Sequence, residues 1–417
     1  MSRNVPKLRF KGFEDEWKEY RLGDFLDFYS TNSLSRDCLN SEDGEVQNIH
    51  YGDIHMKFPT ILDIQKYDLP FINSDIDISK IKDDSFCRDG DIVIADASEN
   101  YDDIGKSIEV ENISNNKVVA GLHTILCRDN KNMTANGFKG YMLSNEYIRK
   151  QIKVLAVGTK VLGISKTNLS TIKANMPSLQ EQEKIANFLS KVDSIIEKQE
   201  KKVEYWNSYK KGMMQKIFKQ EIRFKDDNGL DYSAWEEKKL DYCLQLSEKI
   251  KADNIDRNKL LSVKLNLQGV KVNTNTETLS IGSTIYYKRF KNQFIYGKQN
   301  FFNGSFGIVP NELDGYLSSG DIPALDFIDK NIVPKFLIYY LGRKSFYKRT
   351  ENLASGTGSK RIHESILLDI KINVPVIEEQ RKIANFLSNI DNIIEKENKK
   401  LEELKQWKKG LLQQLFV

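Results

Sequence analysis

Apolar side chains recur every three or four positions along residues 177–218, and the same pattern returns along residues 375–416. This spacing gathers apolar residues on one face of an α-helix. Each segment begins with a proline, which precedes the predicted helix, and Glu or Gln crowd the first turn, where the helix dipole favours acidic groups. The pattern predicts two long amphipathic helices, each roughly 57 Å long.

Each apolar stripe has the spacing of a coiled-coil seam, and an isolated helix would leave that seam exposed to water. The obvious partner for each helix is the other one. The seam positions are Ile185, Phe188, Leu189, Val192, Ile196 and Trp206 in the first helix and Ile383, Phe386, Leu387, Ile390, Ile394 and Trp407 in the second.

The two helical segments are copies of one another. Residues 177–218 align with residues 375–416 without a gap, at an offset of 198, and 23 of the 42 positions are identical. Chance does not produce this agreement, so the chain contains an internal duplication.

A set of segments, called the frame below, occurs once in each half of the chain: RFK, a Trp, a Gly–Thr loop and the long helix. The copies begin at Arg9 and Arg223, and the loops read AVGTK at residues 156–160 and ASGTG at residues 354–358. The stretch between the Trp and the loop, called the filling, differs between the halves in length and sequence.

The fillings contain short β-branched and aromatic runs bounded by Gly, Asn and Asp, which predict strands. Short amphipathic segments between them predict helices. We therefore expect two mixed α/β domains in an α+β fold with an internal duplication.

Composition and charge narrow the possible functions. The 417 residues suffice for two or three domains, and 40% hydrophobic with 29% charged residues is typical of a globular protein. Residues 1–180 carry 23 Lys and Arg against 27 Asp and Glu, whereas the rest carries 40 against 32. This balance permits nucleic-acid binding without requiring it. Scattered cysteines, no membrane-spanning apolar run and no signal peptide predict a cytoplasmic protein with reduced thiols.

Sequence motifs of catalysis are missing. No GxGxxG, P-loop or HExxH occurs, and no two prolines are adjacent, so the Asn/Asp-Pro-Pro-aromatic turn of a DNA amino-methyltransferase is absent. The four histidines are scattered, and the irregular Asp spacing between Asp53 and Asp103 favours a solvated face over a metal cluster. The sequence therefore predicts a protein that is not an enzyme and holds no metal.

These features together resemble the DNA-specificity (S) subunit of Type I restriction-modification systems, over nearly the whole chain. The most specific marks are the P-x-x-x-EQ-x-KIA-x-FL-x-x-x-D-x-I helix openings, present twice, and FNGSFGIVPNELDGYLSSGDIP at residues 302–323. The resemblance implies two target-recognition domains, residues 1–176 and 219–374, each reading one half of a bipartite site in double-stranded DNA. Spacer helices at residues 177–218 and 375–417 would separate them and pack antiparallel as a coiled coil, with pseudo-twofold symmetry.

The resemblance also implies partners and cofactors. Each long helix would dock one methyltransferase (M) subunit through its seam residues. The two M subunits would carry S-adenosylmethionine and methylate adenine N6, and restriction (R) subunits would use ATP and Mg for translocation and cleavage. The chain itself would hold no cofactor and would be a non-catalytic recognition subunit.

DNA contacts are expected first at the Gly–Thr loops and the basic residues after them. Glycine lets the backbone approach a phosphate, and Lys or Arg neutralises it or forks onto guanine. These residues are Gly158, Thr159, Lys160 and Lys166 in the first half and Gly356, Thr357, Lys360 and Arg361 in the second. A second group places aromatic beside basic residues: Tyr286, Tyr287, Lys288, Arg289 and Lys291. An ordinary tight turn or a solvated basic residue explains each of them equally well.

Two other hypotheses stay open at this point. A coiled-coil adaptor whose variable domains bind proteins explains the helices, but not two divergent fillings in one frame. A single-chain enzyme that cuts or methylates DNA lacks its motifs. Salt-sensitive binding to a duplex by the chain with its M subunits separates recognition from the adaptor, and methyl transfer by the chain alone would revive the enzyme.

Overall fold

A computed structural model describes residues 4–275, 282, 284–356 and 359–417 of the chain. Compact packing divides it into two units. Unit 1 comprises Met1–Lys201 and Lys399–Val417, and unit 2 comprises Lys202–Asn398. Each long helix therefore contributes one part to each unit, and the domain boundaries implied by the resemblance stay a prediction.

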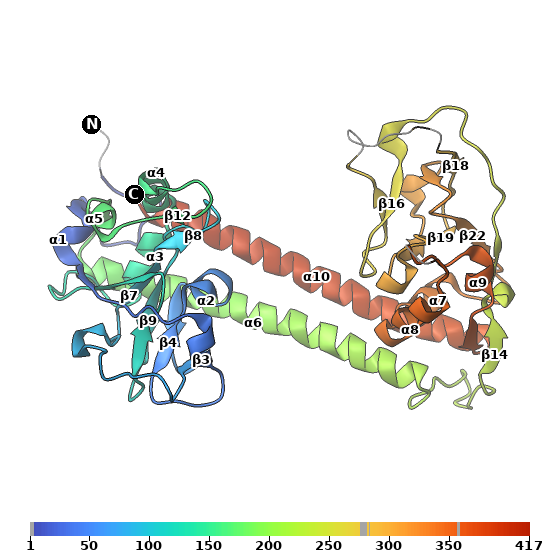
Figure 1. Ribbon diagram of the computed structural model, residues 1–417, viewed down its shortest axis with the longest axis horizontal. Helices are drawn as coiled ribbons and strands as arrows, with labels where there is room; N and C mark the ends of the chain where they lie inside the picture. Colours follow the sequence, from blue (N-terminus) through green and yellow to red (C-terminus); the bar gives the residue numbers. More distant parts are fainter. Residues whose placement is uncertain (1–3, 276–281, 283, 357–358) are drawn as a thin grey trace. The chain divides into compact units, whose positions relative to one another are not determined.

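Unit 1 contains a five-stranded mixed sheet in the order β2-β11-β7-β9-β5 and a four-stranded sheet in the order β10-β4-β6-β3 (Figure 1). The strands are β1 Lys18–Arg21, β2 Asp27–Tyr29, β3 Leu39–Asn40, β4 Gln47–Ile49, β5 Ile61–Asp63, β6 Phe71–Ile72, β7 Ile92–Ala95, β8 Ala97–Ser98, β9 Ser107–Glu111, β10 Val118–Ala120, β11 Thr124–Arg128, β12 Leu162–Gly163 and β13 Lys173–Met176. The helices are α1 Leu22–Phe25, α2 Tyr51–Met56, α3 Phe138–Ser144, α4 Glu146–Leu155, α5 Lys166–Ser170 and the part of α6 (Leu179–Phe218) that ends at Lys201. Every residue of β7 (IVIA) is buried, as its β-branched sequence requires.

Unit 2 contains a four-stranded antiparallel sheet in the order β15-β22-β19-β20 and three two-stranded ribbons, β14-β23, β16-β17 and β18-β21. The strands are β14 Glu236–Lys239, β15 Leu244–Leu246, β16 Leu261–Val263, β17 Val270–Val272, β18 Tyr286–Lys288, β19 Phe294–Tyr296, β20 Phe306–Ile308, β21 Leu317–Ser319, β22 Ala324–Phe327 and β23 Lys371–Val374. The helices are α7 Pro334–Leu341, α8 Lys344–Arg349, α9 Glu364–Leu368 and α10 Ile377–Leu415.

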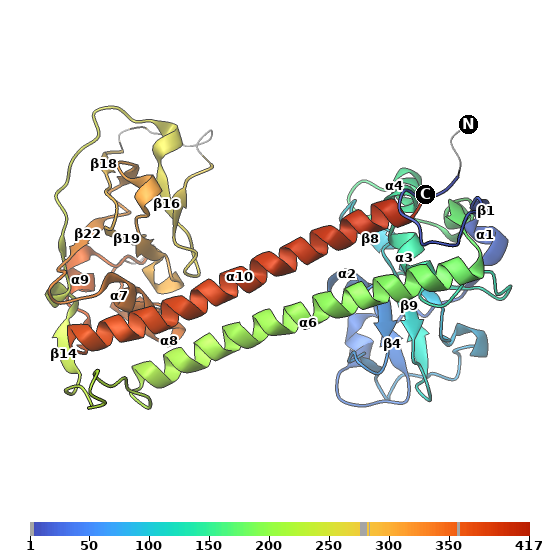
Figure 2. The same ribbon diagram turned by 180° about the vertical axis from the view of Figure 1, so that it is seen from behind.

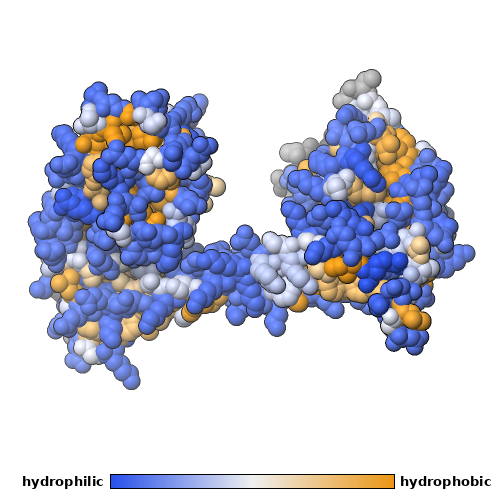
Figure 3. Space-filling view, turned by 90° about the horizontal axis from the view of Figure 1, so that it is seen from below, coloured by the Kyte–Doolittle hydropathy of each residue, from blue (hydrophilic) through white to orange (hydrophobic). Residues whose placement is uncertain are grey.

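In each unit α6 and α10 run antiparallel, which confirms the expected pairing of the two long helices (Figure 2). The ion pairs between them are Lys405–Glu200 and Lys408–Asp193 in unit 1 and Lys202–Glu397 and Lys210–Asp391 in unit 2. Within each unit the residue number rises along α6 as it falls along α10. On the face drawn in Figure 3 the long helices present mostly hydrophilic residues, as expected when their apolar stripes are covered.

The predicted seam packs against the filling as well as against the other helix. In unit 2, Ile383, Leu387 and Ile390 are buried in one cluster with the aromatic side chains of α7. Trp407 differs, because it is 47% exposed and touches Phe188 edge-on, with 6.5 Å between ring centroids. Of the remaining seam residues, the structure buries Ile185, Leu189, Val192 and Ile196 and leaves Phe188, Trp206, Phe386 and Ile394 half-buried.

The acidic residues between Asp53 and Asp103 do not all form a solvated face, and that expectation is wrong for three of them. Asp53, Asp63 and Asp91 are buried, and each pairs with a basic side chain. The shortest pair joins Asp91 to Arg128, at 2.7 Å. Burial of a carboxylate requires such a partner, and sequence spacing does not reveal a partner that is distant along the chain.

Candidate functional site

An arginine of the frame holds the first turn of the long helix in each unit. In unit 1 the Arg9 guanidinium donates to both oxygens of Glu181 at 2.8 Å. In unit 2 Arg223 donates to both oxygens of Glu379 at 3.0 and 2.6 Å. Both glutamates are buried. Because a buried carboxylate needs a charged donor, RFK and the helix opening occur together in both halves.

The glutamine that follows each of these glutamates joins the helix to the filling. The side-chain oxygen of Gln182 accepts from Ala135 N at 2.9 Å, and that of Gln380 accepts from Val333 N at 2.8 Å. Each amide nitrogen donates to the carbonyl of the proline that precedes the helix. The EQ motif is therefore a structural feature of the frame, repeated in both units.

A tyrosine, an aspartate and a lysine form the third repeated contact. Tyr141 donates to Asp193 at 2.8 Å in unit 1, and Tyr339 donates to Asp391 at 2.6 Å in unit 2. A lysine of the opposite long helix pairs with each aspartate. Burial and the neighbouring carboxylate raise the pKa of both tyrosines, so each hydroxyl keeps its proton.

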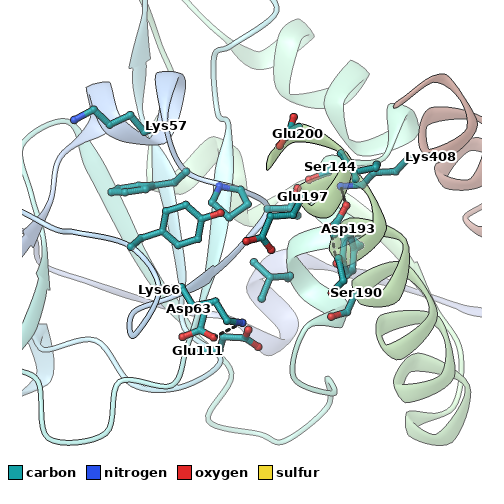
Figure 4. A pocket seen from close by; sticks show the side chains of 18 of the residues that line it. Lys57, Asp63, Lys66, Glu111, Ser144, Ser190, Asp193, Glu197, Glu200 and Lys408 are labelled. Carbon is teal, nitrogen blue, oxygen red and sulfur yellow. Dashed lines mark hydrogen bonds and ion pairs between the residues drawn. The ribbon is translucent and has the colours of Figure 1, made fainter. Parts of the chain in front are cut away.

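A groove opens beside this cluster in unit 1, with a volume of about 440 Å³. Asp63, Lys66 and Glu111 gather on one side, and Glu197 and other side chains of α6 lie on the other (Figure 4). Unit 2 has a groove of about 470 Å³ beside its own Tyr–Asp–Lys cluster. Within the described residues no group of three His, Cys, Asp or Glu side chains is arranged to hold a metal ion.

Paired backbone hydrogen bonds close the base of each Gly–Thr loop, at equivalent places in the two units. Val157 and Gly163 exchange two backbone hydrogen bonds at 2.9 and 2.8 Å. Gly158 has φ +144°, and a Cβ there would lie 2.0 Å from a backbone oxygen, so only glycine fits. Ser355 and Arg361 pair in the same way at 3.0 and 2.8 Å in unit 2.

The remaining loop residues are placed as follows. Gly158, Thr159 and Lys160 are exposed in unit 1, and Gly356 is exposed in unit 2 with φ +111°. Thr357 lies outside the described residues. Their role as DNA contacts stays a prediction, because the positive φ alone already explains a glycine at positions 158 and 356.

The basic residues that follow the loops lie at the surface, and each forms a hydrogen bond or an ion pair within its own unit. Lys166 Nζ donates to Tyr29 O at 2.8 Å in unit 1. In unit 2 Lys360 pairs with Glu351 at 2.8 Å, and Arg361 pairs with Asp321 at 3.0 Å. Exposed pairs of this kind are weak, so these cations remain available to an anion such as phosphate.

The second predicted group, on and after β18, is divided between surface and core. Tyr287 and Lys288 are half-buried and Lys291 is exposed. Tyr286 and Arg289 are buried, at 8% and 3% exposed. Because buried side chains cannot reach a duplex without repacking, their burial argues against direct contact.

Arg289 has structural partners for its charge. Its guanidinium donates to Ser318 Oγ at 2.6 Å and to Ile322 O at 2.9 Å, and it lies 5.5 Å from the ring centre of Tyr287. Burial lowers the pKa of Arg289 to about 10. The Arg289 side chain therefore joins the end of β18 to β21 and to the turn that follows β21.

Three of the four histidines, scattered along the sequence, come together in unit 1. The rings of His50, His55 and His123 lie 4.6, 6.0 and 5.4 Å from the ring centre of Tyr51. Burial and the nearby Arg36 lower the pKa of His50. No sequence motif signals this grouping, because it depends on how α2 packs beside the turn before β11.

The chain matches known proteins over most of its length. Residues 14–205 and 232–406 each match the Type I restriction modification DNA specificity domain. The MjaVIII Type I restriction enzyme specificity subunit of Methanocaldococcus jannaschii is 29% identical over 296 residues, which cover 67% of this chain and 68% of the relative. The putative MjaX specificity subunit of the same organism is 26% identical over 319 residues, 71% of both chains.

Solved structures agree in fold. The S subunit of a Type I restriction-modification system from M. genitalium superimposes with a TM-score of 0.57 at 16% identity, covering 99% of both chains. A chain from a study of complex assembly and conformational transition of the type I R-M system gives 0.52 at 14% identity, covering 97% of this chain and 98% of that one. Among the described helices none combines the length and apolar character needed to cross a membrane. Two matched domains that together span most of the 417 residues place this chain in the Type I restriction modification DNA specificity family.

Proposed function

We propose that the chain reads a bipartite DNA site, with each unit contacting one half-site in double-stranded DNA. The observation that carries this proposal is the repeated frame around two unlike fillings. The Arg–Glu, Gln and Tyr–Asp–Lys contacts recur in both units. The sheets that they support differ in strand number and order. A shared frame with different fillings suits two readers of different sequences.

The Gly–Thr loops support a DNA-facing edge in each unit. The loop hairpins occupy equivalent places, and exposed basic residues lie on them or follow them. The excess of basic residues after residue 180 also suits a polyanion. In this proposal phosphate contacts position each unit, and side chains of the filling and of the segment just after the loop read the bases.

Two M subunits are the proposed protein partners, one for each unit. The Tyr–Asp–Lys cluster occurs once in each unit, with a groove of similar volume beside it, so two copies of one protein would find the same tyrosine, aspartate and lysine there. The M subunits would supply S-adenosylmethionine and methylate adenine N6, and R subunits would supply the ATP- and Mg-dependent cleavage. This chain would act in the cytoplasm and contribute recognition without catalysis.

Exchange of one filling tests the proposal. Residues 23–157 are replaced by the filling of a related subunit, and methylated adenines are mapped in cells that carry the complete system. We expect one half-site to change and the other to stay the same. A change in both half-sites, or binding of the complex to DNA without sequence preference, would contradict the two-reader proposal and favour an adaptor.

A further inference from the structure

Backbone hydrogen bonds identify equivalent residues in the two fillings, next to the Gly–Thr loops. In unit 1 the backbone N of Asp96 donates to His123 O at 3.0 Å, and Asp96 O accepts from Ile164 N at 2.9 Å. Unit 2 repeats these two bonds at 2.9 and 2.8 Å with Lys298, Asp321 and Ile362. Lys298 therefore stands in the place of Asp96, and Asp321 in the place of His123.

The side chains at these equivalent positions differ in the sign of their charge. Asp96 lies 3.5 Å from His123 Nδ1 in unit 1. Lys298 lies 3.0 Å from Glu364 in unit 2. Glu364 in turn aligns with Lys166 of unit 1, at the offset of 198 between the two halves. An acceptor in one unit is thus a donor in the other, on the same backbone.

Arg361 adds a donor that unit 1 lacks, because the residue that aligns with it at the offset of 198 is Gly163. One guanidinium nitrogen lies 3.0 Å from Asp321 Oδ1, and the two side chains are 37% and 53% exposed. A guanidinium has five N–H donors in a planar fork, so the pairing with Asp321 orients the group and leaves other donors for an external acceptor.

A small recess of about 120 Å³ lies beside Lys298 and Glu364. Lys298 follows β19 and Glu364 begins α9; both elements are labelled in Figure 1. Ser247 lines it, is buried at 7% exposed, and has no hydrogen-bond partner for its hydroxyl among the described residues. A buried hydroxyl is normally hydrogen-bonded, so Ser247 offers a polar group to whatever enters this recess.

We propose that positions 96/298, 123/321, 163/361 and 166/364 determine which bases the two units read, and that Arg361, oriented by Asp321, reads a guanine in the half-site of unit 2. The chemistry follows from the major groove, where guanine presents two acceptors to a forked donor and the amino groups of cytosine and adenine present donors to a carboxylate. Exchanging donors for acceptors on one backbone gives two readers of different base pairs. This inference rests on the proposed function.

The test uses the full chain in complex with its methyltransferase partners, as wild type and as Arg361→Gln. Methylated adenines are mapped, and duplexes substituted at each base pair compete for the complex at one salt concentration. We expect one G·C position in one half-site to lose its preference, by roughly 5- to 150-fold, because glutamine pairs with adenine instead. The other half-site keeps its sequence. Asp321→Asn should reduce the same preference to a smaller extent.

Lys360→Gln is the matched control, since Lys360 is the adjacent exposed cation and pairs with Glu351. It should weaken binding to all duplexes alike and leave every base preference unchanged. A normal methylation motif that persists unaltered in Arg361→Gln, or a unit 2 half-site without a G·C pair, would overturn the inference alone. A wild-type complex that methylates no bipartite motif would instead contradict the proposed function.

Discussion

The core cluster around β7 and β9 of unit 1 is mainly aliphatic, whereas the large core cluster of unit 2 is rich in aromatic side chains. Val93, Ile108 and Leu126 are fully buried in the first. Phe301 and Phe306 stack in the second, with ring centroids 4.9 Å apart. The frame contacts nevertheless recur, so the long helices are held by the same residues whatever the filling contains. The difference shows that the frame and the filling obey separate packing requirements.

The hydrogen bonds of the frame tryptophan differ between the units. In unit 2 Trp235 Nε1 donates to Glu379 at 3.1 Å, so this carboxylate is bonded by a tryptophan as well as by an arginine. In unit 1 Trp17 Nε1 is buried without a hydrogen-bond partner among the described residues. We call the Arg9–Glu181 pair and the Arg223–Glu379 pair the two clamps. Both contain the same ion pair, but only in unit 2 does the tryptophan N–H beside it have a hydrogen-bond acceptor.

The largest effect is expected from breaking these clamps. Glu379→Ala and Glu181→Ala each leave a partly buried arginine unpaired and should lower the free energy of unfolding by about 3–5 kcal/mol. The loss should be about 1 kcal/mol larger for Glu379, which also loses the tryptophan bond. Hydrogen exchange resolved by segment, with urea unfolding, measures both variants. Glu183→Ala, exposed on the same helix turn, is the control. Equal loss of protection in both units with either variant would refute separate clamps.

A smaller effect is expected at the Tyr–Asp–Lys clusters. Tyr339→Phe and Tyr141→Phe each remove a hydrogen bond to a carboxylate and should cost about 1.5–3 kcal/mol. The raised pKa of each tyrosine also predicts that the free energy of unfolding depends on pH in the alkaline range. An unfolded tyrosine ionises near pH 10 while the native one stays protonated, so wild-type stability is lost as pH rises above about 10. The Phe variants should show a shallower alkaline loss, measured by urea unfolding from pH 8 to 11. An unchanged slope would mean that the hydroxyls are ionised or exposed, and Tyr205→Phe, 60% exposed, is the control.

The frame was predictable from the sequence because it is local and repeated. The three-and-four spacing specifies α6 and α10, and the offset of 198 connects the Gly–Thr loops. The partners of the frame were not predictable, because Arg9 meets Glu181 across 172 positions of chain. Packing of the filling determines which residues meet at that range.

The candidate site was predictable only in outline. The sequence located the Gly–Thr loops, where Gly158 has the positive φ that glycine permits. It failed to anticipate that Arg289 is buried, because the partners of its guanidinium, Ser318 and Ile322, lie 29 and 33 positions further along the chain. It also missed Asp96 and His123, which backbone pairing between distant strands brings together.

Reversing the charges of the Lys298–Glu364 pair in unit 2 tests whether this pair contributes to stability and to base reading. Lys298→Glu places a second carboxylate beside Glu364, and Lys298→Glu with Glu364→Lys restores an opposite pair in reverse order. We expect a coupling of roughly 0.5–3 kcal/mol, so that the double variant regains most of the stability lost by the single one. Thermal unfolding measures the coupling, and mapping of methylated adenines checks whether only the unit 2 half-site changes. Additive losses would show that the pair contributes nothing as a pair.

The smallest effect compares single lysines on the two loops. Lys160→Ala and Lys360→Ala should each lower the slope of log K against log salt concentration by about one unit if each lysine touches one phosphate. Lys360 already pairs with Glu351, so its contact competes with that ion pair and its loss should weaken binding less than loss of Lys160. Glu351→Gln releases Lys360 and should tighten binding of the complex slightly, with most of the gain at low salt, where charge interactions are least screened. The measurement is duplex binding by the complex across a salt series. If neither alanine variant changed the slope, the loops would face away from DNA; if only one did, phosphate contact by these lysines would be confined to one unit.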